Sequence, residues 1–281
     1  MLVYNMHTDS CFLTGKSHQV CQDYALSGTK KDVPYAIVAD GCSSSPNTDI
    51  GARLVSHALT QKLPISDKLR HREITPDIIQ VIETARNATS LLGLPIECLD
   101  STLLHCEFIW SKLNSAPCDS PRMSENCEYL SCMVIGDGII AARLRSGGIE
   151  AWRIECKNNS PEYLSYMLDD NRHARFISQF GVDKTVIRRA VDKSLHEMPK
   201  ADFAYRIWFS DAYDIVALMS DGIATFDGMD WGEVVDNLMD FKNVTGSFVQ
   251  RRMKRFVKEC QEKGIHHYDD VAMAAIYTGD K

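Results

Sequence analysis

The stretch PYAIVADGCSSS, Pro34–Ser45, joins an apolar run to an acid, a glycine and a cluster of small polar residues. Far downstream, DIVALMSDGIATF, Asp214–Phe226, repeats this arrangement. An Asp-Gly pair between apolar runs is typical of a tight β-hairpin, but neither pair here is followed by a second strand. Both stretches therefore predict a buried strand that ends in a rigidly held carboxylate, Asp40 in the first and Asp221 in the second.

Other acids lie beside apolar runs in the same way. Asp23 lies in CQDYALSG, just before an alternating stretch, and Asp269 and Asp270 immediately precede the apolar run VAMAAIY. Asp137-Gly138 lies between CMVIG and IIAARL, which both resemble strands, so a hairpin turn and a site residue are equally open there. Carboxylates held at strand ends are positioned rigidly and can converge.

Converging carboxylates need a counter-charge. Several unpaired carboxylates at one point repel each other strongly in a low dielectric, so such a cluster requires cations. Oxygen ligands select hard ions, Mg²⁺ or Mn²⁺, over zinc. Two such ions about 3.5–4 Å apart can hold a phosphoryl group and activate a water molecule between them. The set of acids therefore indicates a site for divalent cations.

Length and composition limit the class of protein. The chain has 281 residues, near the upper limit for one hydrophobic core, and its 44% hydrophobic and 25% charged residues are ordinary for a globular protein. The net charge of −7 argues against nucleic acid or an anionic membrane as the main partner. No apolar run approaches the roughly 20 residues that span a bilayer. The ten cysteines include no C-x-x-C pair, and no signal peptide is evident, so we expect a reduced, cytoplasmic protein.

The pattern along the chain predicts consecutive strands with helices segregated between them. A helix is expected with Thr48 or Asp49 as its N-cap, and a second between Pro76 and Gly93, with Thr75 as its N-cap. Residues 157–200 read as a polar, less regular region. The order favours an α+β layered sandwich. Two later helices are expected near 230–241 and 246–262. The expected strands are 33–39, 101–110, 129–136, 139–146, 148–155, 203–210, 215–220 and 271–277. The helix positions expected to be buried are Leu54, Val55, Ala58, Leu59, Ile78, Ile82, Ala85 and Leu92.

Six fragments, taken together and in this order, resemble the metal-dependent serine/threonine protein phosphatases of type 2C. They are SHQVCQD, AIVADG followed by GARLVSHAL, DSTLL, VIGDG, ALMSDG and DDVAMAAI. The resemblance runs from about Gly15 to Tyr277, and its beginning is most similar to a bacterial or phage-type subgroup. It implies one domain over residues 1–281, a four-layer α-β-β-α sandwich of two packed antiparallel sheets flanked by helices. It also implies a variable flap around residues 157–200, where substrate would be selected.

The resemblance also implies roles for individual residues. Asp40 would bridge two Mg²⁺ or Mn²⁺ ions, and the carbonyl of Gly41 would bind one of them. Asp221 and Asp269 would hold one ion, and Asp23 would contribute directly or through water. A hydroxide bridging the two metals would attack the phosphorus in line, with Asp40 and His18 as the catalytic residues and no covalent phosphoenzyme.

Four positions depart from the family pattern. Gln22 replaces a glutamate of many members, and His18 stands where many members place an arginine that grips the substrate phosphate. A protonated histidine can donate to phosphate, but it is not a bidentate fork, and a structural histidine is the other interpretation. Cys42 stands where some members have a histidine. For a third metal, Asp137 is present, but Thr225 replaces the second acid.

Four further patterns have interpretations that require no catalytic role. Ser43–Ser45 lack a Gly-x-Ser-x-Gly elbow and read as a loop over the metal site. His266-His267 lack partners at zinc-ligand spacing. The basic stretch Gln250–Glu259 reads as the solvated face of an amphipathic helix, and the cations of NRHARF and VIRRAVDK are either solvated or meet an acidic or phosphorylated partner.

The leading functional hypothesis is a metal-dependent phosphatase that hydrolyses phosphoserine or phosphothreonine in a phosphorylated protein substrate. The alternative is a catalytically weak or inactive phosphatase-fold module that binds a phosphorylated partner or regulates a kinase. A hydrolase for small phosphorylated metabolites is a third option, with a closed pocket as its mark. The retained Asp40, Asp221 and Asp269 favour an enzyme, because mutually repelling carboxylates are costly to keep without a use.

Overall fold

Two antiparallel sheets form the centre of the computed structural model, which describes residues 5–65, 76–112, 126–181, 183–198 and 204–279. The first sheet has seven strands in the order β1 (His7–Leu13), β12 (Val271–Tyr277), β11 (Tyr213–Met219), β6 (Gly138–Leu144), β7 (Ile149–Cys156), β8 (Lys184–Arg189) and β9 (Leu195–Met198). The second has five strands in the order β10 (Ala204–Phe209), β5 (Asn126–Ile135), β4 (Leu103–Lys112), β3 (Val33–Ala39) and β2 (Tyr24–Lys30).

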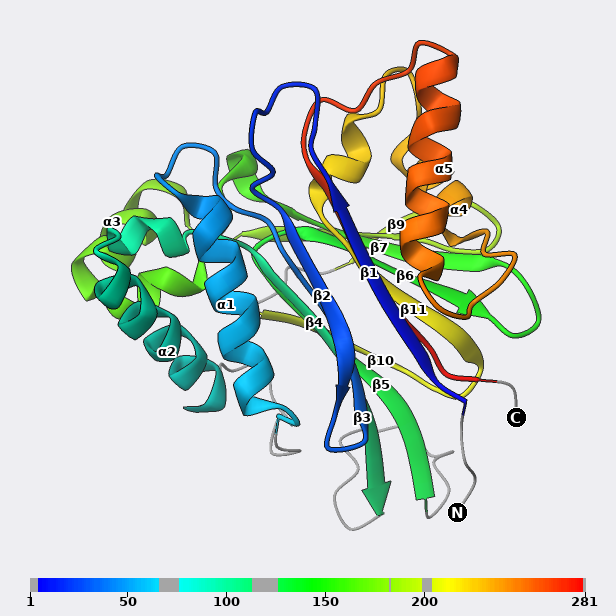
Figure 1. Cartoon of the computed structure of the whole chain (residues 1–281), viewed down its shortest axis with the longest axis horizontal. Helices are drawn as coiled ribbons and strands as arrows, with labels where there is room; N and C mark the ends of the chain where they lie inside the picture. Colours follow the sequence, from blue (N-terminus) through cyan, green and yellow to red (C-terminus); the bar gives the residue numbers. More distant parts are fainter. Residues whose placement is uncertain (1–4, 66–75, 113–125, 182, 199–203, 280–281) are drawn as a thin grey trace.

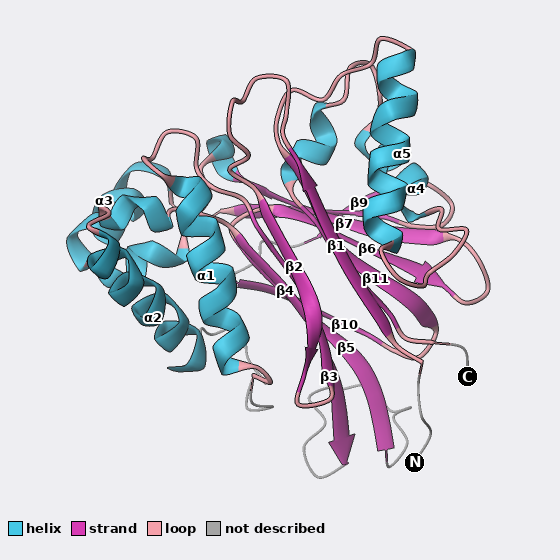
Figure 2. Cartoon of the chain, viewed as in Figure 1, coloured by secondary structure: helices cyan, strands magenta, loops and turns pink. Residues whose placement is uncertain are grey.

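Helices cover the outer faces of both sheets. Figure 1 shows α1 (Thr48–Lys62) and α2 (Pro76–Leu92) on one side of the strands, and α4 (Trp231–Met239) and α5 (Phe248–Glu262) on the other. A further helix, α3 (Asp170–Phe180), lies near α1 and α2, at the end of the sandwich (Figure 2). The predicted four-layer α-β-β-α sandwich is therefore confirmed.

Three apolar clusters separate the four layers. One lies between the sheets and includes Val38, Leu104 and Ile140, a second packs α4 and α5 on the seven-stranded sheet, and a third packs α1 and α2 on the five-stranded sheet. Strand β12 is buried along its whole length because Ala272 and Ala274 face the other sheet while their neighbours face the helices. A strand covered on both faces reads as a continuous apolar run, which explains why the sequence located it.

The predicted N-cap of α1, Thr48 or Asp49, is wrong by at least one residue. Its N-cap is Asn47, which has a left-handed backbone with φ of 56°, a conformation that asparagine tolerates better than most residues. Thr48 does not cap the helix; its hydroxyl donates instead to the carbonyl of Cys42 at 3.1 Å. The side chain of this residue therefore ties the helix to the loop that follows β3.

Helix α2 begins at Pro76 and ends before Gly93, whose φ is 67°, as predicted. The predicted N-cap, Thr75, lies outside the described residues. Ile78, Ile82 and Ala85 are buried, as predicted. Leu92 was predicted to be buried and is 60% exposed, because it stands in the last turn, beyond the reach of the sheet.

Residues 157–200 are more regular than their polar composition suggested. They contain two short 3₁₀ helices, η2 (Lys157–Asn159) and η3 (Leu164–Leu168), followed by α3 and by strands β8 and β9. The two strands extend one edge of the seven-stranded sheet, and every residue of β9 is exposed. A charged, exposed edge strand carries no apolar alternation, which is why the sequence did not indicate it.

In the described part of the chain, no helix has the length and apolar character needed to cross a membrane. Cys21, Cys106 and Cys132 are free and buried, as expected for cysteines that act as small apolar residues. Helix α5 is amphipathic as predicted, with Met253 and Phe256 buried against the sheet.

Candidate functional site

A cavity of about 200 Å³ lies at one end of the sandwich, where strands of both sheets end. The predicted site residues that line it are His18, Asp40, Gly41, Asp137, Asp221 and Asp269. Asp23, which is 2% exposed, lies against them because its carboxyl group is hydrogen-bonded to the side chains of Asp40 and Ser220. The structure therefore brings all the predicted site residues together.

The two sheets contribute equally to this meeting point. Asp23 immediately precedes β2, and Asp40 immediately follows β3, both in the five-stranded sheet. Asp221 follows β11 after one residue, and Asp269 lies shortly before β12, both in the seven-stranded sheet. The acids converge because the ends of these four strands lie together.

Asp137 is not in a hairpin. It follows β5, which belongs to the five-stranded sheet, and it precedes β6, which belongs to the seven-stranded sheet. The chain therefore crosses from one sheet to the other at this residue, and its side chain, 6% exposed, lines the cavity. Of the two interpretations that the sequence left open, the hairpin turn is wrong.

The loop that carries Asp40 is held by backbone hydrogen bonds. The amide of Thr102 donates to the carbonyl of Asp40 at 2.8 Å, and the amide of Cys42 donates to the carbonyl of Asp100 at 2.8 Å. A Cβ at Gly41 would lie 2.8 Å from the Cβ of Thr48 and 2.9 Å from the carbonyl oxygen of Gln22, closer than side chains pack. Only glycine fits between these residues, so the backbone at Gly41 can pack closely against them at the cavity wall.

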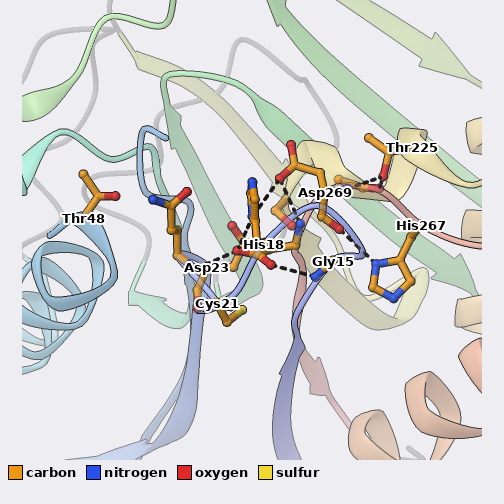
Figure 3. A network of polar contacts seen from close by, with 12 residues as sticks. Gly15, His18, Cys21, Asp23, Thr48, Thr225, His267 and Asp269 are labelled. Atoms are coloured by element: carbon orange, nitrogen blue, oxygen red, sulfur yellow. Dashed lines mark hydrogen bonds and ion pairs between the residues drawn. The ribbon is translucent and has the colours of Figure 1, made fainter. Parts of the chain in front are cut away.

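A buried acid that the sequence left without a role holds the loop between β1 and β2. The carboxylate of Asp270, 1% exposed, accepts hydrogen bonds from the amide of Gly15 at 2.7 Å and the amide of Gln22 at 2.6 Å. His18 lies on this loop, with its Nδ1 2.9 Å from a carboxylate oxygen of Asp270 and 3.6 Å from one of Asp269 (Figure 3). Asp270 therefore sets the place of His18 at the cavity wall.

The polar residues next to Asp269 hold its backbone. Thr225, at the position where the family's third metal would need an acid, accepts a hydrogen bond from the amide of Asp269 at 3.2 Å and donates to the carbonyl of Gly222 at 2.8 Å. His267 lies on the other side, with Nδ1 2.9 Å from the carbonyl of Asp269 (Figure 3). Both residues thus position Asp269.

Three arginines of NRHARF and VIRRAVDK are paired with acids of the protein itself. Arg172 pairs with Asp100, and Arg189 makes two hydrogen bonds with Asp236, at 2.7 and 2.8 Å. Arg188 bonds Glu150 at 2.6 Å. These side chains stabilise the fold, which neither of the two sequence interpretations anticipated.

Burial, followed by the negative charges of neighbouring acids, raises the pKa values of Asp23, Asp40, Asp137 and Asp269. Burial, with the negative charges of Asp270 and Asp221 nearby, raises the pKa of Asp23 to about 8. Burial and the charges of Asp23 and Asp221 raise the pKa of Asp40 well above its usual range. Burial and Asp221 also raise the pKa of Asp137, to about 7, although Lys184 and Arg153 oppose the shift. Burial likewise raises that of Asp269.

The donor set fits hard divalent cations. The Oδ2 atom of Asp23 is buried and has no hydrogen-bond partner among the described residues, which is costly for a carboxylate. The converging acidic side chains are carboxylates, the oxygen ligands that Mg²⁺ and Mn²⁺ prefer. His18 is the one residue of the described cavity wall able to carry positive charge. A cation would both satisfy the orphaned oxygen and relieve the repulsion among the acids.

Comparisons with known proteins agree with this geometry. Residues 14–267 match the family model described as protein phosphatase 2C. No curated protein matches the chain. The serine/threonine phosphatase Stp1 from Staphylococcus aureus has a similar structure, with a TM-score of 0.54 and 11% sequence identity over 99% of this chain and 96% of that one.

Two other solved structures share the fold. A bacterial serine phosphatase has a TM-score of 0.53 and 11% identity over 99% of this chain and 100% of that one. The S. agalactiae serine/threonine phosphatase has a TM-score of 0.51 and 11% identity over 97% of this chain and 99% of that one. Because the family model matches most of the sequence and the fold agrees, this chain belongs to the protein phosphatase 2C family.

Proposed function

We propose that this protein is a Mg²⁺- or Mn²⁺-dependent phosphatase that hydrolyses phosphoserine or phosphothreonine in proteins. The observation that carries the proposal is the group of acids at the cavity, where burial and neighbouring negative charges raise the pKa values of Asp23 and Asp40, and where a buried oxygen of Asp23 has no partner among the described residues. Acids crowded in this way are stable together only when protonated or when cations lie between them. Membership of the phosphatase family favours the cations.

The proposed ligands are those that the family resemblance implies, and their position at or beside the cavity supports the proposal. Asp40 and the carbonyl of Gly41 would hold two ions, Asp221 and Asp269 would complete the site on the side of the seven-stranded sheet, and Asp23 would act through its free oxygen or through water. When bound, the ions would supply a water molecule of lowered pKa as the nucleophile and would neutralise charge on the phosphoryl group. The protein's part is to hold these oxygens rigidly at the strand ends.

His18 is proposed to bind the substrate phosphate. Its Nδ1 faces the carboxylates of Asp269 and Asp270, which leaves the second ring nitrogen for a phosphoryl oxygen. A ring held on one side by buried Asp270 is pre-oriented, so less freedom is lost when the substrate binds. His18 thus would take the place of the family's arginine as a single donor.

A third ion at Asp137 has less support than the first two. Lys184 and Arg153 already place positive charge near this carboxylate, and Thr225 is engaged in positioning Asp269. We therefore propose two ions as the working set, with Asp137 contributing negative charge to the cavity.

The test is the release of phosphate from a phosphothreonine peptide by the purified protein. We expect release with Mn²⁺ or Mg²⁺, none after addition of EDTA, and release reduced at least about 100-fold in Asp40→Asn. Asp240→Asn, which changes an exposed acid paired with Lys242, is the matched control and should behave like wild type. A small phosphorylated sugar, tested in parallel, separates a protein phosphatase from a metabolite hydrolase.

Failure of the test has a clear meaning. If the folded protein releases no phosphate with either ion, yet binds the phosphothreonine peptide in a calorimetric titration, the chain is a phosphopeptide-binding module. Release that persists in Asp40→Asn would remove the proposed metal bridge.

A further inference from the structure

We propose that Asp100 is a positioning residue that fixes a substrate-selecting segment, residues 159–180, against the loop that carries Asp40. The proposal rests on the proposed phosphatase function, since it concerns how that cavity distinguishes a phosphorylated protein from a small phosphate ester. Asn159, Pro161 and Tyr163 of this segment line the cavity, so its position determines the shape of the wall opposite the acids.

Three parts of the chain meet at the carboxylate of Asp100. This residue lies between the 3₁₀ helix η1 (Ile96–Leu99) and β4, and it is 1% exposed. The hydroxyl of Ser165 donates to its Oδ1 at 2.6 Å, and the hydroxyl of Ser45, in the loop after Asp40, donates to its Oδ2 at 2.7 Å. Arg172, from α3, forms an ion pair with the same Oδ2. One carboxylate therefore joins the Asp40 loop to the 159–180 segment.

A second contact joins the same two parts of the chain nearer the cavity. The hydroxyl of Tyr163 is hydrogen-bonded to the thiol of Cys42, two residues after Asp40. Because the Asp40 loop and the 159–180 segment are hydrogen-bonded at two separate points, the segment can neither slide nor tilt freely against the loop.

The 159–180 segment is rigid enough to transmit this constraint. The ring of Tyr166 lies 5.6 Å from that of Tyr163 and 4.9 Å from that of Phe176, and the guanidinium of Arg172 lies 4.6 Å from its centre. The side chain of Asp169 caps α3 by accepting from the amide of Arg172 at 3.1 Å. Moving Arg172 therefore displaces the aromatic residues that end at the cavity wall.

A buried ion pair suits this task better than an apolar contact. A carboxylate buried to this degree cannot remain uncompensated, and its two serine donors have fixed directions, so the arrangement that satisfies all three partners is essentially unique. An apolar contact would accept several packings. We infer that the pair selects one position of the segment.

The consequence for substrates depends on their size. The phosphoryl group contacts the acids and His18, whereas the residues that flank it in a protein also reach the wall formed by Asn159 and Tyr163. Loosening the segment should therefore impair a phosphopeptide more than p-nitrophenyl phosphate, whose contacts are confined to the phosphoryl end.

The first experiment compares two arginines of the same helix. Arg172→Ala breaks the pair with Asp100, whereas Arg175→Ala removes a side chain whose Nε bonds only a carbonyl of its own helix, that of Asn171. We measure KM and kcat with Mn²⁺ for a phosphothreonine peptide and for p-nitrophenyl phosphate. Arg172→Ala should lower the ratio of peptide to p-nitrophenyl phosphate efficiency about tenfold, mainly through KM, as expected for the loss of one hydrogen bond to a charged group.

Conservative variants keep the test valid if Arg172→Ala folds poorly. Asp100→Asn keeps the shape of the side chain and removes its charge, and Arg172→Lys keeps the charge and should recover part of the ratio. Equal losses for both substrates, or the same loss in Arg175→Ala, would overturn the proposal.

Amide hydrogen exchange tests the positioning role of Asp100 independently of phosphatase activity. Amide hydrogen exchange of residues 159–180 should accelerate at least about tenfold in Arg172→Ala and Asp100→Asn, with β12 unchanged. If wild type hydrolyses neither substrate, the phosphatase function fails, but accelerated exchange would still support the positioning role of Asp100. Unchanged exchange would overturn that role whatever the activity.

Discussion

Asp100 and Asp23 are acids of nearly equal burial, 1% and 2% exposed, yet their surroundings are opposite. Asp100 is satisfied by Ser45, Ser165 and Arg172. Asp23 faces other acids, and its Oδ2 has no partner among the described residues. The first carboxylate stabilises the fold as it stands, whereas the second destabilises it until something else binds. Burial alone does not distinguish a structural acid from a functional one; the partners do.

The largest expected effect that tests this contrast is that of Asp40→Asn. Phosphate release in Mn²⁺ should fall at least about 100-fold, the usual scale for losing one group that stabilises charge in the transition state. The same change should not lower the melting temperature in EDTA, because it removes one of several repelling charges. Both quantities can be measured on one preparation. If the Asp40→Asn protein is unfolded in EDTA, Asp40 stabilises the fold as Asp100 does, and the contrast between structural and functional acids is wrong for this residue.

The pH dependence of stability should be next in size. The folded-state pKa of Asp23 is about 8 and that of Asp137 about 7, against the ordinary 3.8 of each. Groups with raised pKa values stabilise the folded state fully below pH 3.8, and this stability is lost as the pH rises toward 8. The free energy of unfolding in EDTA should thus fall by a few kcal/mol, on the order expected for such shifts, between pH 5 and pH 8.

Urea unfolding at the two pH values, with EDTA or with Mn²⁺, provides the measurement. Mn²⁺ should stabilise more at pH 8 than at pH 5, because the ion displaces protons from its ligands. Asp23→Asn should flatten the dependence in EDTA. A metal-free protein that becomes more stable from pH 5 to pH 8 would contradict the assignment.

A moderate effect is expected at His18. His18→Ala should raise the KM for the phosphothreonine peptide about tenfold, the scale of one charge-assisted hydrogen bond, with a smaller change in kcat. His57→Ala, which removes an exposed histidine that contacts Tyr24, is the matched control. An unchanged KM in His18→Ala would make His18 a structural residue of the loop that Asp270 holds.

The smallest expected effect tests how much one hydrogen bond to Asp100 contributes to stability. Ser45→Ala removes one of the three side-chain partners of Asp100 and should lower the free energy of unfolding by about 1 kcal/mol. Ser43→Ala, two residues away and exposed, should leave it unchanged. Equal values for the two variants, measured by urea unfolding, would show that the hydroxyl of Ser45 contributes nothing to holding Asp100.

Apolar periodicity and strand ends predicted most of the fold and the main acids of the site. Strand β12 was located to the residue because both of its faces are buried, and Asp40 and Asp221 were found because they end such strands. The resemblance then supplied the layer order and the metal assignment. Strands β8 and β9 were not predicted, because β9 is an exposed edge strand and β8 buries the charged residues Lys184 and Arg189, so neither shows a regular apolar alternation.

The residues that hold the site could not be found in the same way. Asp270 acts through the amides of Gly15 and Gln22, and Asp100 acts through Arg172, all far away in sequence. Such contacts depend on tertiary structure and leave no periodic signal. The one available hint was the second acid of the Asp269-Asp270 pair, which had no role in the predicted site.

The convergence of acids from both sheets has a consequence for the lifetime of the fold. An ion shared by Asp40 and Asp269 would be a reversible cross-link between segments near opposite ends of the chain, and such a link closes a loop of most of the polypeptide. The sheets could not then separate without releasing the ion. The free concentration of divalent cation would thus set the rate at which the protein unfolds. In cells short of the metal, the protein would lose its activity and would also be degraded faster.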